Sequence, residues 1–155
     1  MTRKTMILLA AGGSVALLLA AWGFQYLGGL APCAMCIWQR WPHVAAAVIG
    51  PVAAITAGPL LPLLGALSAT TSGGIGVYHT GVERGWWDGP STCTSSPVDG
   101  LSTEELMNQI LTAPLVQCDQ VAWEMLGLSM ASWNAIVSLG FAGLWLIAAR
   151  QTSGD

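Results

Sequence analysis

The sequence MILLAAGGSVALLLAAWGFQYLGGL, from Met6 to Leu30, contains no charged side chain along its whole length. The hydrocarbon core of a bilayer is about 30 Å thick, and a helix needs about 20 apolar residues to cross it. The segment is long enough for this, and it also exceeds the apolar core of a cleaved signal peptide. It therefore predicts a retained helix that spans a membrane.

Three further apolar segments are long enough to span a membrane, and they lie at about 36–57, 60–82 and 128–149. A Gly58-Pro59 turn separates the second and third spans and predicts a tight helical hairpin. Small residues at 72–76 favour close approach of the third helix to a neighbour. Together with the span at about 6–30, they predict an all-α integral membrane protein, a single four-transmembrane-helix bundle over residues 1–155.

The composition supports this fold class and excludes two others. Hydrophobic residues make up 54% of the chain and charged residues only 8%, whereas a soluble domain has about a quarter charged residues. Disordered chains are poor in apolar residues and rich in charge, so disorder is excluded. A net charge of −3 offers no basic surface, so nucleic acid is not an expected partner.

The positive charges near the two ends predict the orientation of the bundle. Arg3 and Lys4 precede the first span, and Arg150 follows the last one. Because short cytoplasmic segments are enriched in Lys and Arg, we expect both termini to be cytoplasmic. The loop at about 83–127, with all but one of the eight acidic residues, is then expected on the outer side.

A short helix is expected within this outer loop. Ser102 and Glu105 have the spacing of a capping box, which marks a helix start. The apolar residues that follow share one helical face: Leu106, Met107, Ile110 and Leu111. Such an amphipathic helix can lie on the membrane surface or pack on the bundle, and the sequence leaves both alternatives open.

All four cysteines, Cys33, Cys36, Cys93 and Cys118, fall on the outer side of the predicted topology. A structural disulfide suits Cys93 and Cys118, but the pair at 33 and 36 would close a very small loop with little benefit to stability. A zinc site would require two closely spaced pairs, which the loop cysteines do not form. Thiol–disulfide redox chemistry is the third alternative.

The surroundings of Cys33 and Cys36 favour redox chemistry. Pro32 predicts a helix start, where unpaired amides and the helix dipole stabilise a thiolate. Arg40 lies one turn deeper than Cys36 on the same helical face. This position is compatible with two roles, a residue of the redox site or an anchor at the membrane interface. His43 lies deeper still and is equally compatible with a hydrogen-bonded core histidine.

Reactive thiols in a membrane require an electron acceptor, and a lipid-soluble quinone is the simplest candidate. Polar side chains at the outer end of the third span could bind its head group, since Tyr78, His79 and Glu83 lie there. His79 and Glu83 are also spaced as a helical i, i+4 pair, so a purely structural role remains open.

Several motifs together carry a family resemblance: Cys33-Ala-Met-Cys36-Ile-Trp-Gln-Arg40, Tyr78-His79-Thr-Gly-Val-Glu83, Gly89-Pro-Ser-Thr-Cys93, Cys118-Asp-Gln-Val-Ala-Trp123 and Leu126-Gly-Leu-Ser-Met130. This combination, spread over nearly the whole chain, resembles the disulfide-bond formation protein B (DsbB) family. The resemblance implies a multi-pass protein of the bacterial inner membrane whose redox cysteines face the periplasm. Such proteins reoxidise a periplasmic thioredoxin-like (DsbA-like) dithiol oxidase and pass two electrons to ubiquinone or menaquinone.

The resemblance also implies a role for each site residue. Cys93 would form the mixed disulfide with the partner, and Cys118 would then attack Cys33. Cys36 would then be the thiolate next to the quinone ring, with Arg40 close to a quinone oxygen. Two more positions match residues that line the family's quinone site: His79 and Met130. Gln39 departs from the pattern, because some members carry Glu there.

Two other functions are compatible with parts of the sequence. A relative of vitamin K epoxide reductase would share the bundle, but its C-x-x-C pair would follow the loop cysteines in chain order. A membrane scaffold with two inert disulfides would need no partner protein beyond the surrounding lipid. We expect a DsbA-like partner and the quinone pool, and no metal.

Overall fold

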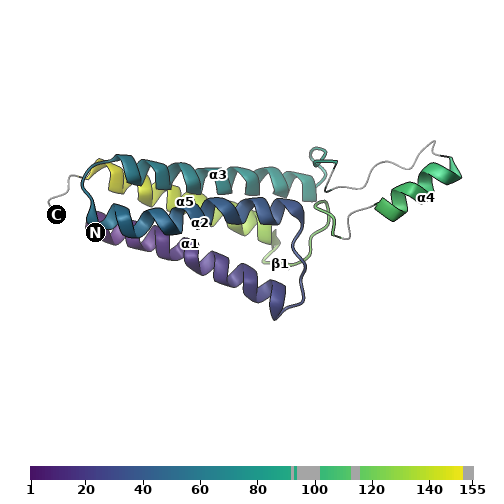
Figure 1. Cartoon of the computed structure of the whole chain (residues 1–155), viewed down its shortest axis with the longest axis horizontal. Helices are drawn as coiled ribbons and strands as arrows, with labels where there is room; N and C mark the ends of the chain where they lie inside the picture. The colour runs from purple at the N-terminus through teal and green to yellow at the C-terminus, as the bar shows by residue number, and fades with distance from the viewer. Residues whose placement is uncertain (92, 94–101, 113–115, 152–155) are drawn as a thin grey trace.

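The computed structural model describes residues 1–91, 93, 102–112 and 116–151 of the chain. Within this part, four long helices lie side by side as an elongated bundle: α1 (Arg3–Tyr26), α2 (Ala34–Ile55), α3 (Leu60–Glu83) and α5 (Met130–Arg150) (Figure 1). Three of them, α1, α3 and α5, are long and apolar enough to cross a membrane. The expectation of a mostly helical membrane protein is thus confirmed.

Helix α2 is as long as its neighbours but less apolar. Its first turns carry Gln39, Arg40 and His43, and these side chains lower the mean hydropathy of the segment. Two of the three are nonetheless inside the protein, since Gln39 and His43 are 6% and 2% exposed. The expectation that α2 is a fourth membrane span stays a prediction.

Small residues line the contacts between the helices. The main core cluster contains many alanines, with Ile7 of α1 and Trp145 of α5 as its largest fully buried side chains. A Cβ atom at Gly76 of α3 would lie 3.0 Å from the Ala131 carbonyl oxygen of α5. The missing side chain therefore allows the two backbones to approach closely, as the small residues at 72–76 predicted.

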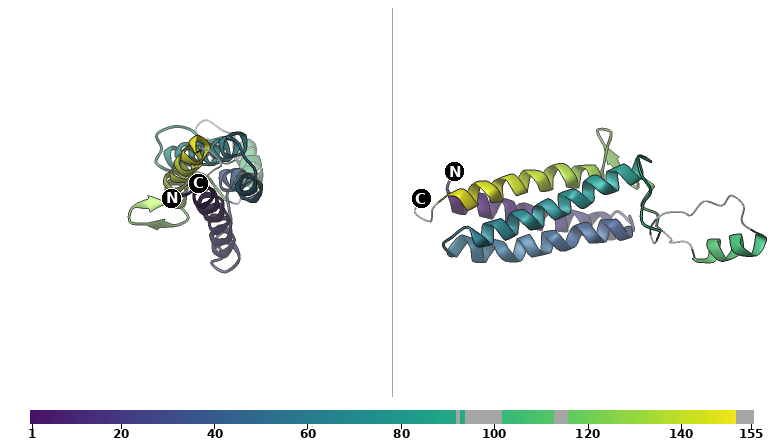
Figure 2. Two further views of the ribbon diagram at one scale, coloured as in Figure 1. Left: turned by 90° about the vertical axis from the view of Figure 1, so that its left-hand side faces the viewer. Right: turned by 90° about the horizontal axis from the view of Figure 1, so that it is seen from above.

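The start of α1 and the end of α5 lie at the same end of the bundle (Figure 2). The Gln151 side chain donates to the Met1 carbonyl oxygen at 3.4 Å. Arg3 is 5% exposed, and its guanidinium donates to carbonyl oxygens of Ala53, Thr56 and Gly58. Since these carbonyls end α2 and form the following turn, the cation is favourably placed at the negative end of the helix dipole. Arg3, used above as an orientation signal, thus also joins α1 to α2.

The other end of the bundle carries the remaining elements. Helix α4 (Thr103–Thr112) begins with the predicted capping box, in which the Ser102 amide donates to Glu105 at 2.8 Å. It lies beyond the end of the long helices rather than against them (Figure 1). Met107 and Leu111 are exposed, whereas the side chains of 106 and 110 fall outside the described part.

A small hairpin that the sequence did not predict precedes α5. Strands β1 (Glu124–Met125) and β2 (Leu128–Ser129) pair antiparallel, with Glu124 opposite Ser129. The turn between them places Leu126 and Gly127 at φ 56° and 75°. The hairpin ends at Ser129, which is the N-cap residue of α5. Its hydroxyl accepts from the Ser132 amide.

Candidate redox-active site

Cys33 and Cys36 lie where the chain enters α2. Cys33 is the N-cap residue, and its sulfur accepts from the Cys36 amide at 3.2 Å. The two sulfur atoms are 2.8 Å apart. The pair therefore occupies the helix start, as Pro32 predicted. The Cys36 amide, which has no partner within the helix, donates to the Cys33 sulfur.

The surroundings of Cys33 favour its thiolate form. The adjacent Cys36 thiol and the His79 ring lower the pKa of the Cys33 thiol well below its ordinary value, although burial acts in the opposite direction. The Cys33 sulfur also accepts from the Cys36 amide, and this hydrogen bond stabilises a negative charge on that sulfur. These contacts favour the thiolate form of Cys33.

The other two cysteines form a disulfide that packs against Cys33 at this helix start. Cys93 and Cys118 are joined, with their Cα atoms 5.3 Å apart. Both are buried, and they pack with Cys33, Met35 and Val82 in one cluster. The Cys118 amide also donates to the Cys93 carbonyl oxygen at 2.6 Å. The loop disulfide is therefore held against the first cysteine pair.

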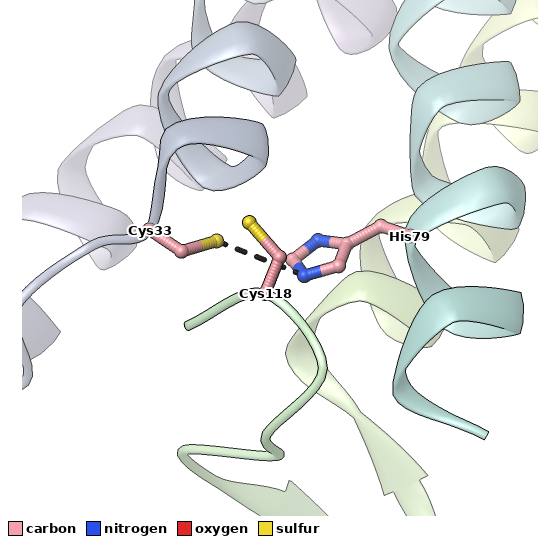
Figure 3. Close-up of side chains that lie close together, drawn as sticks. All are labelled: Cys33, His79 and Cys118. Carbon is pink, nitrogen blue, oxygen red and sulfur yellow. Dashed lines mark hydrogen bonds between the residues drawn. The ribbon is translucent and has the colours of Figure 1, made fainter. Parts of the chain in front are cut away.

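His79 brings α3 into the same cluster (Figure 3). Its Nε2 lies 3.7 Å from the Cys33 sulfur. One ring nitrogen of His79 and the sulfurs of Cys33 and Cys118 all lie within 4.8 Å of one another. Because the Cys118 sulfur is bonded to Cys93, it is not a free thiolate for a metal, and the arrangement suits disulfide exchange.

On the other side of the pair, a cavity of about 350 Å³ opens between α1, α2 and α5. Three predicted cofactor residues line it: Cys36, Arg40 and Met130. His79 is not among the described residues of its lining. Aromatic and aliphatic side chains form most of the wall, including Phe24, Trp123 and Trp133. Arg40 donates to the Gln25 side-chain oxygen at 2.7 Å, which anchors its guanidinium at the wall.

The predicted site residues are thus divided between two sides of one cysteine pair. Cys33, His79 and the loop disulfide lie on one side, and Cys36, Arg40 and Met130 lie on the other. Gln39 and Asn134 hydrogen-bond each other in the bundle interior at 2.7 Å. The sequence singled out Gln39 only as a departure from the family pattern and did not single out Asn134. An asparagine inside an apolar span was the available signal, because such residues usually bond to a neighbouring helix.

The comparison with known proteins decides the family. The family model described as "Disulfide bond formation protein DsbB" matches residues 3–148. The chain belongs to the DsbB family. This confirms the resemblance in the motifs and gives the protein a role as an oxidoreductase in disulfide bond formation. It also disfavours the inert scaffold.

Several individual relatives agree with this assignment. The chain is 34% identical over 131 residues to "Disulfide bond formation protein B" of Xanthomonas oryzae pv. oryzae, covering 78% of this chain and 74% of the relative. It is 31% identical over 143 residues to the protein of that name from Albidiferax ferrireducens, covering 83% and 80%. The match to the Hahella chejuensis protein of that name is 27% over 161 residues, covering 96% and 94%. No solved structure matches the chain significantly.

Proposed function

We propose that this DsbB-family protein reoxidises a periplasmic DsbA-like dithiol oxidase and passes the two electrons to ubiquinone or menaquinone. One observation carries the proposal. The sulfurs of Cys33 and Cys118 lie within 4.8 Å of each other, and Cys36, 2.8 Å from Cys33, lines an apolar cavity. The cysteines thus form a continuous path from the loop to the cavity.

The first exchange takes place at the loop disulfide. A thiolate of the partner attacks the Cys93 sulfur, so that a mixed disulfide forms and Cys118 leaves as a thiolate. The partner's second thiolate then attacks the sulfur of the partner's first cysteine in the mixed disulfide, and Cys93 is released as a thiolate. The partner has lost two electrons and gained a disulfide, and Cys93 and Cys118 hold those electrons as thiols.

The second exchange moves the electrons toward the cavity, once Cys33 and Cys36 are joined as a disulfide. The Cys118 thiolate attacks the Cys33 sulfur, the bond between Cys33 and Cys36 breaks, and Cys36 leaves as a thiolate. The Cys93 thiolate then attacks Cys118, which restores the loop disulfide and releases Cys33. The dithiol now lies beside the cavity.

The cavity residues fit a quinone head group. The volume of about 350 Å³ falls in the range of ligand pockets, and its wall is apolar with few polar groups. Cys36, Arg40 and Met130 would hold the ring, with the Arg40 guanidinium donating to a ring oxygen. A bound quinone supplies a two-electron acceptor, and its reduction to quinol re-forms the disulfide of Cys33 and Cys36.

The same proposal places the protein in the bacterial inner membrane with α2 as the fourth span. Met1 and Gln151 meet at one end of the bundle. Helix α2, with Cys33 as its N-cap, begins at the opposite end (Figure 1). With Lys4 and Arg150 at the first end, the positive-inside rule puts that end in the cytoplasm. The cysteines then face the oxidising periplasm.

This function predicts that the cysteine pairs are labile. In native detergent-solubilised protein, we expect a mild dithiol reductant to open the loop disulfide, and added quinone to restore it without another oxidant. Thiol counting by alkylation and mass measurement follows both steps. A scaffold with inert disulfides would instead resist the reductant, and quinone would leave its thiol count unchanged.

The order of the cysteines also separates this proposal from a vitamin K epoxide reductase type. In this chain the C-x-x-C pair at 33 and 36 precedes the loop cysteines. The family match over residues 3–148 supports the DsbB-type function independently of that order.

A further inference from the structure

Behind the cysteine pair, hydrogen-bonded side chains continue into the bundle interior. His79 of α3 contacts Gln39 of α2, Gln39 contacts Asn134 of α5, and Asn134 contacts His43 of α2. Gln39 and His79 are 6% and 3% exposed. The disulfide exchanges described above use none of these contacts, although the first one reaches the ring that faces Cys33.

A backbone carbonyl fixes the orientation of the Gln39 amide. The Gln39 Nε2 donates to the Met35 carbonyl oxygen at 3.2 Å. A carbonyl oxygen can only accept, so the atom that faces it must be the nitrogen. The same nitrogen lies 2.9 Å from His79 Nδ1. It therefore presents its second N–H to that ring nitrogen.

Asn134 fixes the other end of the same amide. Its Nδ2 donates to the Gln39 Oε1 at 2.7 Å and to the Ser72 carbonyl oxygen at 3.3 Å. A rotated Gln39 amide would place its oxygen against the Met35 carbonyl and its nitrogen against the Asn134 nitrogen. Two hydrogen bonds inside the bundle would be lost, at a cost of about 1–3 kcal/mol for each buried group left unpaired.

These contacts determine which nitrogen of His79 carries the proton. Nδ1 faces a donor, so it must be the unprotonated acceptor, and the proton of the neutral ring lies on Nε2. The groups near Nε2 are acceptors, since the Cys33 sulfur lies at 3.7 Å and the Glu83 Oε1 at 3.9 Å. Both sides of the ring specify the same tautomer.

We propose that Gln39 is a positioning residue that holds His79 as the neutral Nε2–H tautomer, with the N–H directed at the Cys33 sulfur. This deepens the proposed function and rests on it. His79 is then a fixed hydrogen-bond donor to Cys33 and does not take a proton from it.

The proposal assigns His79 a definite part in the exchange. When the Cys93 thiolate attacks Cys118 in the Cys33–Cys118 disulfide, a new Cys93–Cys118 bond forms. The electron pair of the broken bond stays on Cys33, which leaves as a thiolate. The Nε2–H donates to this new charge, and no proton moves to or from the ring. A donor that is already oriented requires no rearrangement as the charge develops.

Nitrogen NMR of the two histidines tests the proposal directly. The chain contains only two histidines, so selective ¹⁵N labelling of the full-length reduced protein in detergent gives a simple spectrum, and a His43→Asn variant assigns it. We expect His79 to show a protonated Nε2 and an unprotonated Nδ1 at neutral pH. A protonated Nδ1, in a neutral or a cationic ring, would overturn the proposal.

Changing Gln39 tests its part in setting the tautomer. In a Gln39→Glu variant the carboxylate accepts where the amide donated, so we expect His79 to carry a proton on Nδ1. The new carboxylate also favours a ring that keeps its Nε2 proton, and such a doubly protonated, cationic ring beside Cys33 would shift the pH midpoint of Cys33 alkylation downward. Gln120→Glu is the matched control, because it adds the same charge at an exposed loop position and should leave both readouts unchanged.

These two experiments can contradict the tautomer proposal without bearing on the proposed relay to quinone. An unchanged His79 spectrum in Gln39→Glu would show that another group sets the tautomer, which contradicts the proposal. The wild-type spectrum decides the tautomer even if that variant fails to fold. Neither measurement uses a partner or a quinone, so failure of the relay would leave both readouts interpretable.

Discussion

A variant that keeps only Cys33 and Cys118, made by Cys36→Ser and Cys93→Ser together, is expected to form a disulfide between the two remaining cysteines almost completely under mild oxidant. Their sulfurs already lie within 4.8 Å of each other in the buried cluster. Because the oxidant removes the two electrons, the bond can form without a partner protein. Proteolysis without reductant, followed by mass spectrometry, identifies the linked peptides.

A second double variant provides the matched control. Cys33→Ser with Cys93→Ser leaves Cys36 and Cys118, and Cys36 lines the cavity on the other side of the pair. We expect this pair to close more slowly under the same oxidant. Equal rates for the two variants would contradict the proposal that Cys118 exchanges with Cys33.

Replacing Arg40 with methionine is expected to weaken quinone binding about 10- to 100-fold. A hydrogen bond to a charged group contributes about 1.5–3 kcal/mol, and each 1.4 kcal/mol corresponds to a factor of ten in affinity. Methionine keeps much of the length and apolar stem of the arginine, so the cavity wall should be retained. Quenching of tryptophan fluorescence by added quinone can measure the affinity, since Trp123 and Trp133 line the cavity.

Arg84→Met is the control for the loss of one positive charge. Arg84 lies outside the cavity lining, with its guanidinium 5.7 Å from the centre of the Trp86 ring. We expect its quinone affinity to match the wild type. An unchanged affinity in Arg40→Met itself would remove Arg40 from the proposed quinone site.

The long helices were predictable because their apolar segments are long and nearly free of charge. The predicted limits of about 6–30 and 128–149 differ from α1 (Arg3–Tyr26) and α5 (Met130–Arg150) by only a few residues. The start of α2 was placed at 36, whereas the helix begins at Ala34 because the Cys33 side chain itself caps it.

The small hairpin before α5 was not predictable from turn residues. Gly127 supplies one positive φ angle, but the turn also requires one from Leu126, at φ 56°. Leucine rarely adopts this conformation. The pairing of β1 with β2 is therefore specified by the surrounding fold rather than by local preference.

The site was predictable in its cysteines and only partly in its polar contacts. Spacing along a helix placed Cys36 and Arg40 on one face, and both line the cavity. Spacing could not show that His79 faces Cys33 from α3, because this depends on how α2 and α3 are rotated against each other. The same limit hid the contact between Gln39 and Asn134, which joins two helices far apart in the sequence.

Quinone absorbance during turnover with a reduced DsbA-like donor tests the central claim most directly. The account predicts steady quinone reduction by the wild-type protein in detergent. It predicts a loss of about 10³-fold or more in Cys93→Ser and in Cys36→Ser, because each removes a reacting sulfur. Absence of quinone reduction by the wild type, with several quinones and donors, would contradict the relay. Full activity in Cys93→Ser would show that the partner does not enter at the loop disulfide.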